Sequence, residues 1–194
     1  MKTVILMRHS AIDRQPNLDP ANPPLSLRGE MLAQRIFIHK ELLNVTHVYS
    51  SPLRRAYDTA RMSGRQVFAD SRLVERVVGE PISTQESFWK MQYADHDFKN
   101  PNGESMSEVK ERMTSFMNEL LLKIKDGETA VVVSHAGAIC AYLLNFCNIT
   151  VLNPAEKTRE IIFGDKVVLS GRFRAPGAFI LEWENDRLIN MRYI

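Results

Sequence analysis

The chain has 194 residues, 44% of them hydrophobic, which suits a single domain spanning residues 1–194 with a sizeable core. Its 25 basic and 23 acidic residues leave a net charge of +2 without any long basic run, so the composition argues against nucleic-acid-binding and membrane-surface proteins. No stretch approaches the ~20 apolar residues of a membrane span, and Arg8 interrupts the first apolar run too early for a signal peptide, so we expect a cytoplasmic protein.

The first ten residues hold the most informative pattern. Residues 3–7 form an apolar run long enough for one buried strand, and the run ends directly on Arg8 and His9. Ligands of α/β sheets bind beyond the carboxyl ends of the strands, so both side chains should lie at the mouth of a site. A second β-branched run over 129–134 ends in the same way on His135. Two such strands in one sheet could place the two imidazoles face to face.

The region after the first strand should be irregular and then helical. Residues 11–25 contain four prolines and are expected to form a loop that walls the site. Ser26 has the character of an N-cap for a helix running to about Leu43. The apolar face of this helix, at helical spacing, comprises Leu27, Met31, Ile38 and Leu42.

A strand over 45–49 and a second helix follow. Ser51 is expected to be the N-cap of this helix and Pro52 its first residue. Arg54 and Arg55 then fall in the first turn, where adjacent side chains point about 100° apart. At most one of the two arginines should therefore face the site, and the residues alone do not choose between them.

The middle of the chain gives one weak and one strong pattern. Residues 66–69 suggest a short third strand, and 84–93 a short helix. Residues 95–97 (Asp-His-Asp) are interpreted as a polar turn and not as a metal site, because no second cluster of ligands accompanies them. A capping box at Ser105 and Glu108 predicts the start of a long helix. Its apolar stripe comprises Met106, Val109, Met113, Phe116, Leu120 and Ile124.

The C-terminal part is predicted to be mixed. A helix is expected over about 137–146. Cys140 and Cys147 fall in the same apolar, helical stretch, seven residues apart, and we interpret both as buried free thiols. Residues 153–160 suggest another helix. Two strands over 178–183 and 188–193 should pair around a hairpin turn. The whole pattern predicts an α/β domain with an antiparallel edge.

Histidine and arginine at strand ends indicate phosphoryl chemistry. A neutral imidazole can attack phosphorus and hold the phosphoryl group covalently. The transferred group carries negative charge on three oxygens, so fixed cations and donors must surround it, and the planar fork of Arg8 suits that task. The helix opening near Gly137 would add backbone N–H groups. A carboxylic acid could give the leaving alkoxide its proton, and the scheme needs neither a metal nor an organic cofactor.

The ordered motifs resemble those of the histidine phosphatase superfamily, the phosphoglycerate mutase-like proteins. The family's Arg-His-Gly appears here with Ser10 in place of the glycine, and its Pro-Leu-Thr segment is matched by residues 24–26 with Gly29 following. The family's Ser-x-Leu-x-Arg-Ala-x-x-Thr-Ala motif fits residues 51–60 throughout. Its remaining motifs are similar to Leu73-Val74-Glu75, Gly103-Glu104-Ser105 and Ser134-His135-Ala136. The resemblance implies a three-layer α/β/α sandwich with a mostly parallel central sheet.

The same resemblance implies roles for individual residues. His9 would be the nucleophile that becomes phosphohistidine, and Glu75 the proton donor. Arg8, Arg55 and His135 would bind the phosphoryl group. The residues by themselves gave no reason to choose Glu75 among 23 acidic residues.

Two departures favour a phosphatase over a mutase. Residues 10–13 (Ser-Ala-Ile-Asp) replace the Glu and Asn of the family's mutases, and 194 residues leave little room for their extra length. We therefore expect a metal-independent phosphomonoesterase for a small phosphorylated metabolite, without a cofactor. A phosphoglycerate mutase-type transferase and a non-catalytic member that binds a phosphorylated ligand are the alternatives. The loop 11–25 and the segment 76–102 are expected to set substrate choice, while the substrate itself and the oligomeric state stay open.

Overall fold

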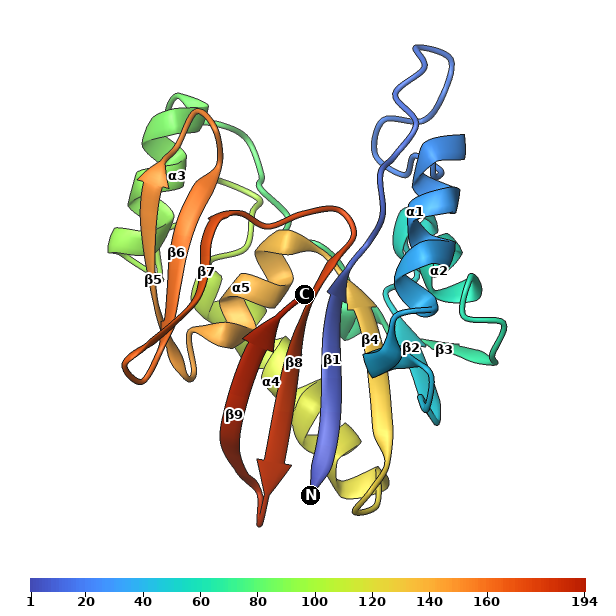
Figure 1. Ribbon diagram of the computed structural model, residues 1–194. Helices are drawn as coiled ribbons and strands as arrows, with labels where there is room; N and C mark the ends of the chain where they lie inside the picture. The colour runs from blue at the N-terminus through green and yellow to red at the C-terminus, as the bar shows by residue number, and fades with distance from the viewer.

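A computed structural model describes residues 1–194 and contains a six-stranded central sheet (Figure 1). Its strands are β1 (Lys2–Arg8), β2 (His47–Ser50), β3 (Val67–Ala69), β4 (Thr129–Ser134), β8 (Gly177–Glu184) and β9 (Arg187–Tyr193). In the spatial order β3-β2-β4-β1-β8-β9, the first four strands run parallel, while β8 pairs antiparallel with both β1 and β9. The predicted mostly parallel sheet with an antiparallel edge is confirmed.

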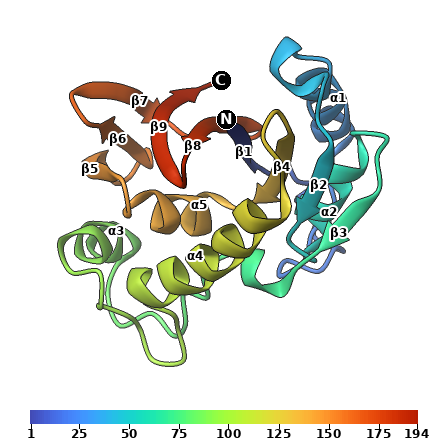
Figure 2. The same ribbon diagram turned by 90° about the horizontal axis from the view of Figure 1, so that it is seen from below.

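Helices cover both faces of this sheet (Figures 1 and 2). They are α1 (Leu27–Phe37) and α2 (Arg54–Arg61) on one face, and α4 (Met106–Lys123) and α5 (Ala136–Leu143) on the other. The alternation of side chains along β1 explains this arrangement. Val4 and Leu6 pack in the cluster that includes α4 and α5, whereas Ile5 and Met7 pack in the cluster that includes α2. Because all four residues from Val4 to Met7 are buried, the sheet needs a helical layer on each side.

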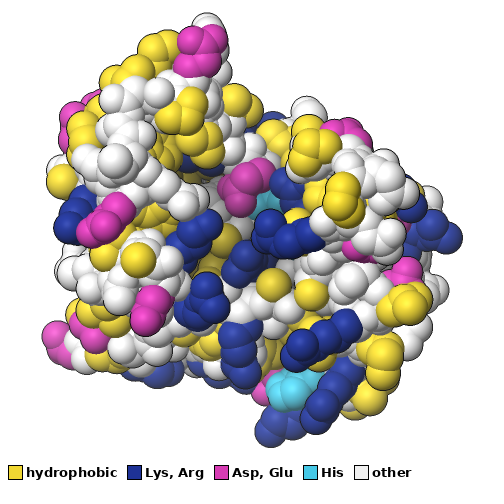
Figure 3. Space-filling model, turned by 90° about the horizontal axis from the view of Figure 1, so that it is seen from above, with side chains coloured by type: hydrophobic (Ala, Val, Ile, Leu, Met, Phe, Trp, Pro, Cys, Tyr) yellow, Lys and Arg dark blue, Asp and Glu magenta, His cyan; other side chains and the backbone are white.

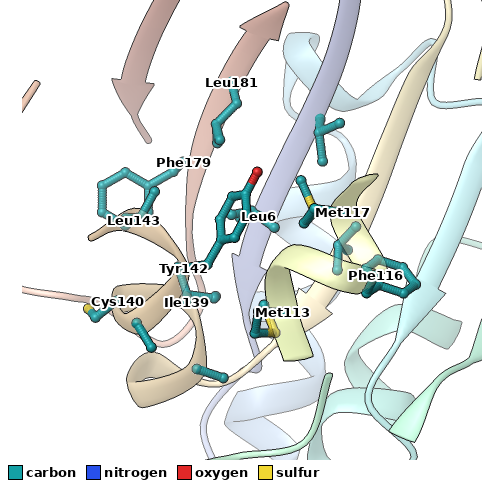
Figure 4. Close-up of a cluster of buried hydrophobic side chains, with 14 of the residues drawn as sticks. Leu6, Met113, Phe116, Met117, Ile139, Cys140, Tyr142, Leu143, Phe179 and Leu181 are labelled. Carbon is teal, nitrogen blue, oxygen red and sulfur yellow. The ribbon is translucent and has the colours of Figure 1, made fainter. Parts of the chain in front are cut away.

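The layer of α4 and α5 holds the larger core (Figure 4). The predicted capping box is present: the Ser105 hydroxyl accepts from the Glu108 N–H at 3.1 Å, and the Glu108 carboxylate accepts from the Ser105 N–H at 2.8 Å. All members of the predicted apolar stripe from Met106 to Ile124 are buried. In Figure 4, Met113 and Met117 of α4 lie beside Tyr142 of α5, so the methionines serve the core.

The prediction for the buried face of α1 is wrong. Leu27, Met31 and Ile38 expose 82%, 69% and 74% of their surfaces, and the helix ends at Phe37, with a separate 3₁₀ turn at 40–42. The face toward the protein carries Gly29 and Ala33 instead. A Cβ at Gly29 would lie 1.9 Å from the Ala11 carbonyl oxygen, so the helix approaches the loop too closely for large side chains on that face.

The expected start of α2, with Ser51 as N-cap and Pro52 as first residue, is also wrong by two residues. The helix begins at Arg54 after Leu53, and the Asn22 side chain accepts from the Arg54 N–H at 2.7 Å. The side chain that accepts from the first turn of α2 therefore comes from the distant loop 11–25. This explains why the local sequence misplaced the start of the helix.

Residues 147–172 form a separate three-stranded antiparallel sheet that the sequence did not predict. It consists of β5 (Cys147–Asn153), β6 (Thr158–Phe163) and β7 (Lys166–Arg172). The predicted helix over 153–160 is wrong, because β6 begins at Thr158 and pairs on both sides with its neighbours. Cys147 likewise lies in β5, although both thiols are buried and free as expected. We call this sheet, together with α3 (Gln85–Ala94) beside it in Figure 1, the cap.

None of the helices combines the length and the apolar character that a membrane span requires.

Candidate active site

The register between β1 and β4 brings the two strand-end histidines together. Arg8 lies opposite Ser134, and the His9 N–H donates to the Ser134 carbonyl at 2.9 Å. One residue beyond the end of each strand, His9 and His135 are neighbours, with ring centroids 5.2 Å apart and ring planes tilted by 57°. The prediction of two adjacent imidazoles at the carboxyl edge of the sheet is confirmed.

The hydrogen bonding of His9 assigns its tautomer. Its Nδ1 lies 2.8 Å from the Ser10 carbonyl oxygen, which can only accept, so Nδ1 carries the proton. The lone pair is therefore on Nε2. Burial lowers the pKa of His9 to about 3; the hydrogen bond to the Ser10 carbonyl opposes this shift, and the charges of Arg8 and Arg55 add to it. The ring is neutral at neutral pH and retains 8% of its surface accessible.

His135 is held by Ser51, a residue whose role the sequence analysis missed. The Ser51 hydroxyl accepts from the Leu53 N–H at 3.2 Å, and it lies 2.9 Å from His135 Nε2. We assign the hydroxyl proton of Ser51 to His135 Nε2, and with this assignment the proton of His135 is on Nδ1. That Nδ1 is buried and has no partner in the protein. Burial, followed by the charges of His9 and Arg55, lowers the pKa of His135 well below its usual value.

Arg8 and Arg55 surround the imidazoles with positive charge. The Arg8 guanidinium donates to the Phe173 carbonyl, while its Nε is buried without a partner. Arg55 is half-buried, and Glu75 interacts with its charge. Arg54 is exposed instead and pairs with Asp58 of the next turn at 3.4 Å. The structure therefore turns Arg55, and not Arg54, toward the histidines.

Glu75 lies at the start of α5, where its carboxylate accepts three backbone hydrogen bonds. The donors are the N–H groups of Arg76 at 2.9 Å, Ala138 at 3.0 Å and Gly137 at 3.3 Å. A Cβ at Gly137 would lie 2.6 Å from the Glu75 carboxylate, so this close approach depends on the glycine. The expectation that these N–H groups would face a phosphate is corrected, because they orient the carboxylate.

Ser10, which departs from the family glycine, fits without disturbing the site. The residue is fully buried, its hydroxyl donates to the Gly29 carbonyl at 2.7 Å, and its N–H donates to the Thr59 hydroxyl at 2.9 Å. The extra side chain thus links the strand end to α1 and points away from the imidazoles.

A cleft of about 1450 Å³ opens in front of these residues, and Arg8 and Glu75 lie in its wall. Figure 3 shows dark blue side chains gathered along the hollow between the cap and the lobe of α1 and α2. Among the residues that line the cleft, the cap contributes Lys157, Arg159 and Arg172, and Arg174 follows β7. Sequence reasoning missed Lys157 and Arg159 because it interpreted 153–160 as helical; the run Thr158–Phe163, rich in β-branched residues, was the available signal. No three His, Cys, Asp or Glu side chains converge in a way that could hold a metal ion.

Comparisons with known proteins agree with this geometry. A probable phosphoglycerate mutase from Cronobacter sakazakii is 31% identical over 157 residues, which cover 72% of each chain. A putative phosphoserine phosphatase from Hydrogenobacter thermophilus is 33% identical over 162 residues, or 73% of this chain and 76% of its own. The solved structure of a mycobacterial glucosyl-3-phosphoglycerate phosphatase with inorganic phosphate shares the fold, with a TM-score of 0.69 at 24% identity over 100% of this chain and 96% of that one. The sequence pattern of the histidine phosphatase superfamily (branch 1) matches residues 4–158, and the chain belongs to that superfamily.

Proposed function

We propose that the protein is a metal-independent phosphomonoesterase that hydrolyses a small phosphate ester through a covalent phosphohistidine on His9. The observation that carries the proposal is the pair of neutral imidazoles beside buried donors that the protein leaves without partners, Arg8 Nε and His135 Nδ1. Buried polar groups are almost always satisfied, so such orphans favour a ligand that completes them. The relatives named as phosphatases support the hydrolytic reading.

In the first step His9 Nε2 attacks phosphorus and the ester P–O bond breaks. The tautomer suits this role, because Nδ1 is fixed by the Ser10 carbonyl and the lone pair of Nε2 is available. Arg8, Arg55 and the Nδ1–H of His135 stabilise the charge on the transferring oxygens. The leaving oxygen takes a proton from Glu75, which α5 holds in place.

In the second step water hydrolyses the phosphohistidine. The Glu75 carboxylate, now without its proton, accepts one from the attacking water, the N–P bond breaks, and inorganic phosphate leaves. The electron pair of that bond returns to His9 Nε2. The enzyme is thereby restored without a cofactor.

The test is to trap the intermediate. The protein is mixed with ³²P-labelled substrate and quenched in alkali, because phosphohistidine survives base and is lost in acid. We expect an acid-labile label in the wild type and none in His9→Ala, with turnover reduced on the order of 10⁴-fold or more. His47→Ala is the matched control and should keep the label, because it removes a histidine that pairs with Glu128 at the first residue of β2, at the strand end away from the site. An acid-stable label, or retained turnover in His9→Ala, contradicts the proposal.

One observation favours a second candidate, a phosphoglycerate mutase-type transfer. The Cronobacter relative carries that name at 31% identity. The two reactions share the phosphohistidine and differ in its acceptor. Incubation with 3-phosphoglycerate separates them, since a phosphatase releases inorganic phosphate and a mutase forms 2-phosphoglycerate. A protein that binds phosphate esters and does neither is the non-catalytic alternative.

A further inference from the structure

The cleft is much larger than a phosphoryl group requires, and its charge is uneven. Its volume of about 1450 Å³ exceeds the range of about 300–1000 Å³ typical of small-ligand sites. Glu75 is the only acidic side chain in its wall, whereas seven of the wall residues are Lys or Arg. Not one of these seven has a carboxylate within 4.0 Å. The surplus charge extends well beyond the residues that meet the phosphoryl group.

Arg159 of β6 is the centre of this surplus. It exposes only 4% of its surface, and its Nε has no partner. The other side of the guanidinium is held firmly: it lies 4.5 Å from the centre of the Trp89 ring and donates to the Tyr93 hydroxyl at 3.1 Å and the Cys140 sulfur at 2.8 Å. A buried guanidinium without a counter-ion is costly, so this is a position prepared for an anion.

Exposed cations lie beside Arg159 on the same hairpin. The β6–β7 register puts Thr158 opposite Arg172 and Arg159 opposite Gly171, so Lys157 and Arg172 lie at the same end of the cap sheet as Arg159, and all three residues line the cleft. The Arg172 Nε donates to the Glu156 carbonyl at 2.9 Å, which ties its side chain to the turn that contains Lys157. These positions combine a rigid, buried cation with two accessible ones.

The cap is coupled to the phosphate site. The Phe173 carbonyl, one residue after β7, accepts from the Arg8 guanidinium. Burial lowers the pKa of Arg8, the charge of Glu75 opposes this shift, and the charge of Arg159 adds to it, so the two guanidinium groups interact unfavourably across the cleft. A ligand that places one anion at Arg8 and another at Arg159 would relieve this repulsion.

We propose that Arg159, Lys157 and Arg172 form a second anion-binding subsite, and that the substrate is a phosphate monoester whose leaving group carries a second anionic group, a carboxylate or another phosphate. The inference rests on the proposed phosphatase function and extends it to a substrate class. The cations gather in one cleft and the chain has a net charge of only +2, which fits a small molecule with two anions better than a polyanion.

The test compares matched esters that differ by one anionic group. 3-Phosphoglycerate carries a carboxylate where glycerol 3-phosphate carries a hydroxymethyl group, and glucose 1,6-bisphosphate carries a phosphate where glucose 6-phosphate carries a hydroxyl. In the wild type we expect at least one pair to show a ratio of kcat/KM of about 10 or more in favour of the second anion. The pair with the larger ratio identifies the second group.

Variants locate the effect. Arg159→Met and the double variant Lys157→Gln/Arg172→Gln should each lower that ratio about tenfold, mainly through KM. The double variant changes only exposed side chains, so it keeps the test valid if Arg159→Met folds poorly. Lys123→Gln/Lys125→Gln removes the same charge at the far end of α4 and should leave the ratio within about twofold, because salt screens distant charges. Ratios near one in the wild type, or ratios that the cap variants do not change, overturn the subsite.

Binding separates this outcome from a failure of the proposed function. If no ester is hydrolysed, calorimetric affinities of His9→Ala for the same matched pairs test the subsite directly. A second anion should then strengthen binding about tenfold, and the double cap variant should abolish the gain. Equal affinities within both pairs would reject the subsite independently of turnover.

Discussion

Two sets of arginines in this protein are held in opposite ways. Arg112 of α4 forms a two-pronged pair with Glu104, at 2.8 and 2.9 Å, and donates to the carbonyls of Arg72 and Val74. Arg192 of β9 likewise forks onto Glu41, at 2.5 and 2.9 Å. These guanidinium groups find their acceptors within the chain.

Three arginines around the candidate site do not. Arg8 and Arg55 each donate to a single backbone carbonyl, Arg159 donates only to a hydroxyl and a thiol, and none of the three pairs with a carboxylate. The difference shows that arginine has two roles in this protein, one structural and one in binding. Where the protein satisfies the fork, the arginine holds segments together; where it leaves the fork open, the charge is available to an anion.

The largest expected effect concerns Glu75, the one carboxylate among the unpaired cations. Glu75→Gln keeps the shape and removes the acid, so alkyl phosphates should slow by roughly 10²–10⁴-fold. p-Nitrophenyl phosphate should slow far less, because nitrophenolate leaves without a proton. Values of kcat/KM for both substrate types in wild type and variant provide the measurement. An equal loss for both would assign Glu75 to holding the site, and Glu104→Gln would then be tested as the alternative acid.

A direct comparison within one helical turn comes next. Arg55→Ala removes an unpaired cation beside the histidines and should lower turnover on the order of 10²-fold or more. Arg54→Ala removes an exposed arginine paired with Asp58 and should change turnover by less than about twofold. Both variants are assayed with p-nitrophenyl phosphate. Equal losses, or the reverse order, would show that the motif register is misassigned.

The paired and unpaired arginines should also differ in their contribution to folding. Arg112→Met leaves Glu104 and two backbone carbonyls without their donor, and we expect it to lower the free energy of unfolding by about 2–4 kcal/mol. Arg159→Met removes a buried cation that has no carboxylate and should cost at most about 1 kcal/mol. Urea unfolding measures both. A larger loss for Arg159→Met would mean that its contacts with Trp89 and Tyr93 are chiefly structural.

The smallest effect is a pH dependence that burial imposes on the cleft. The pKa of His9 has its ordinary value of 6.5 in the unfolded chain and falls to about 3 in the folded protein. Between these values the unfolded state binds more protons, so stability falls as pH falls, by up to about 1.4 kcal/mol per pH unit for this group. His9→Asn should reduce that slope, as measured by urea unfolding between pH 6 and pH 4. Identical slopes in the two proteins would show that His9 is not held neutral.

Much of the site was predictable from the sequence because its signals are local. An apolar run that stops on a histidine fixes where that side chain emerges, and the capping box at Ser105 fixes where α4 begins. The ordered motifs identified the family and aligned Arg55 ahead of Arg54. The pairing of His9 with His135 required only that β1 and β4 be neighbours, which holds in the structure.

What the sequence misassigned depends on contacts between distant segments. The outward face of α1 carries Leu27 and Met31 because the Ala11 backbone approaches too closely for anything but small residues on the inner face. Ser51 appeared to be a cap and instead holds the tautomer of His135, a partner 84 residues away.

The sequence by itself determined the strand ends, the long amphipathic helix and the family of motifs, since each is written in residues close together in the chain. Only the tertiary structure decided the cap sheet and the placing of Arg159. Of the predicted helix over 153–160, residues 154–157 form a turn, and residues 158–160 become strand because β5 and β7 offer backbone partners on both sides. The positive charge of the cleft follows from that pairing, because the cap sheet places Lys157 and Arg172 in the wall of the cleft that Arg8, at the end of β1, also lines.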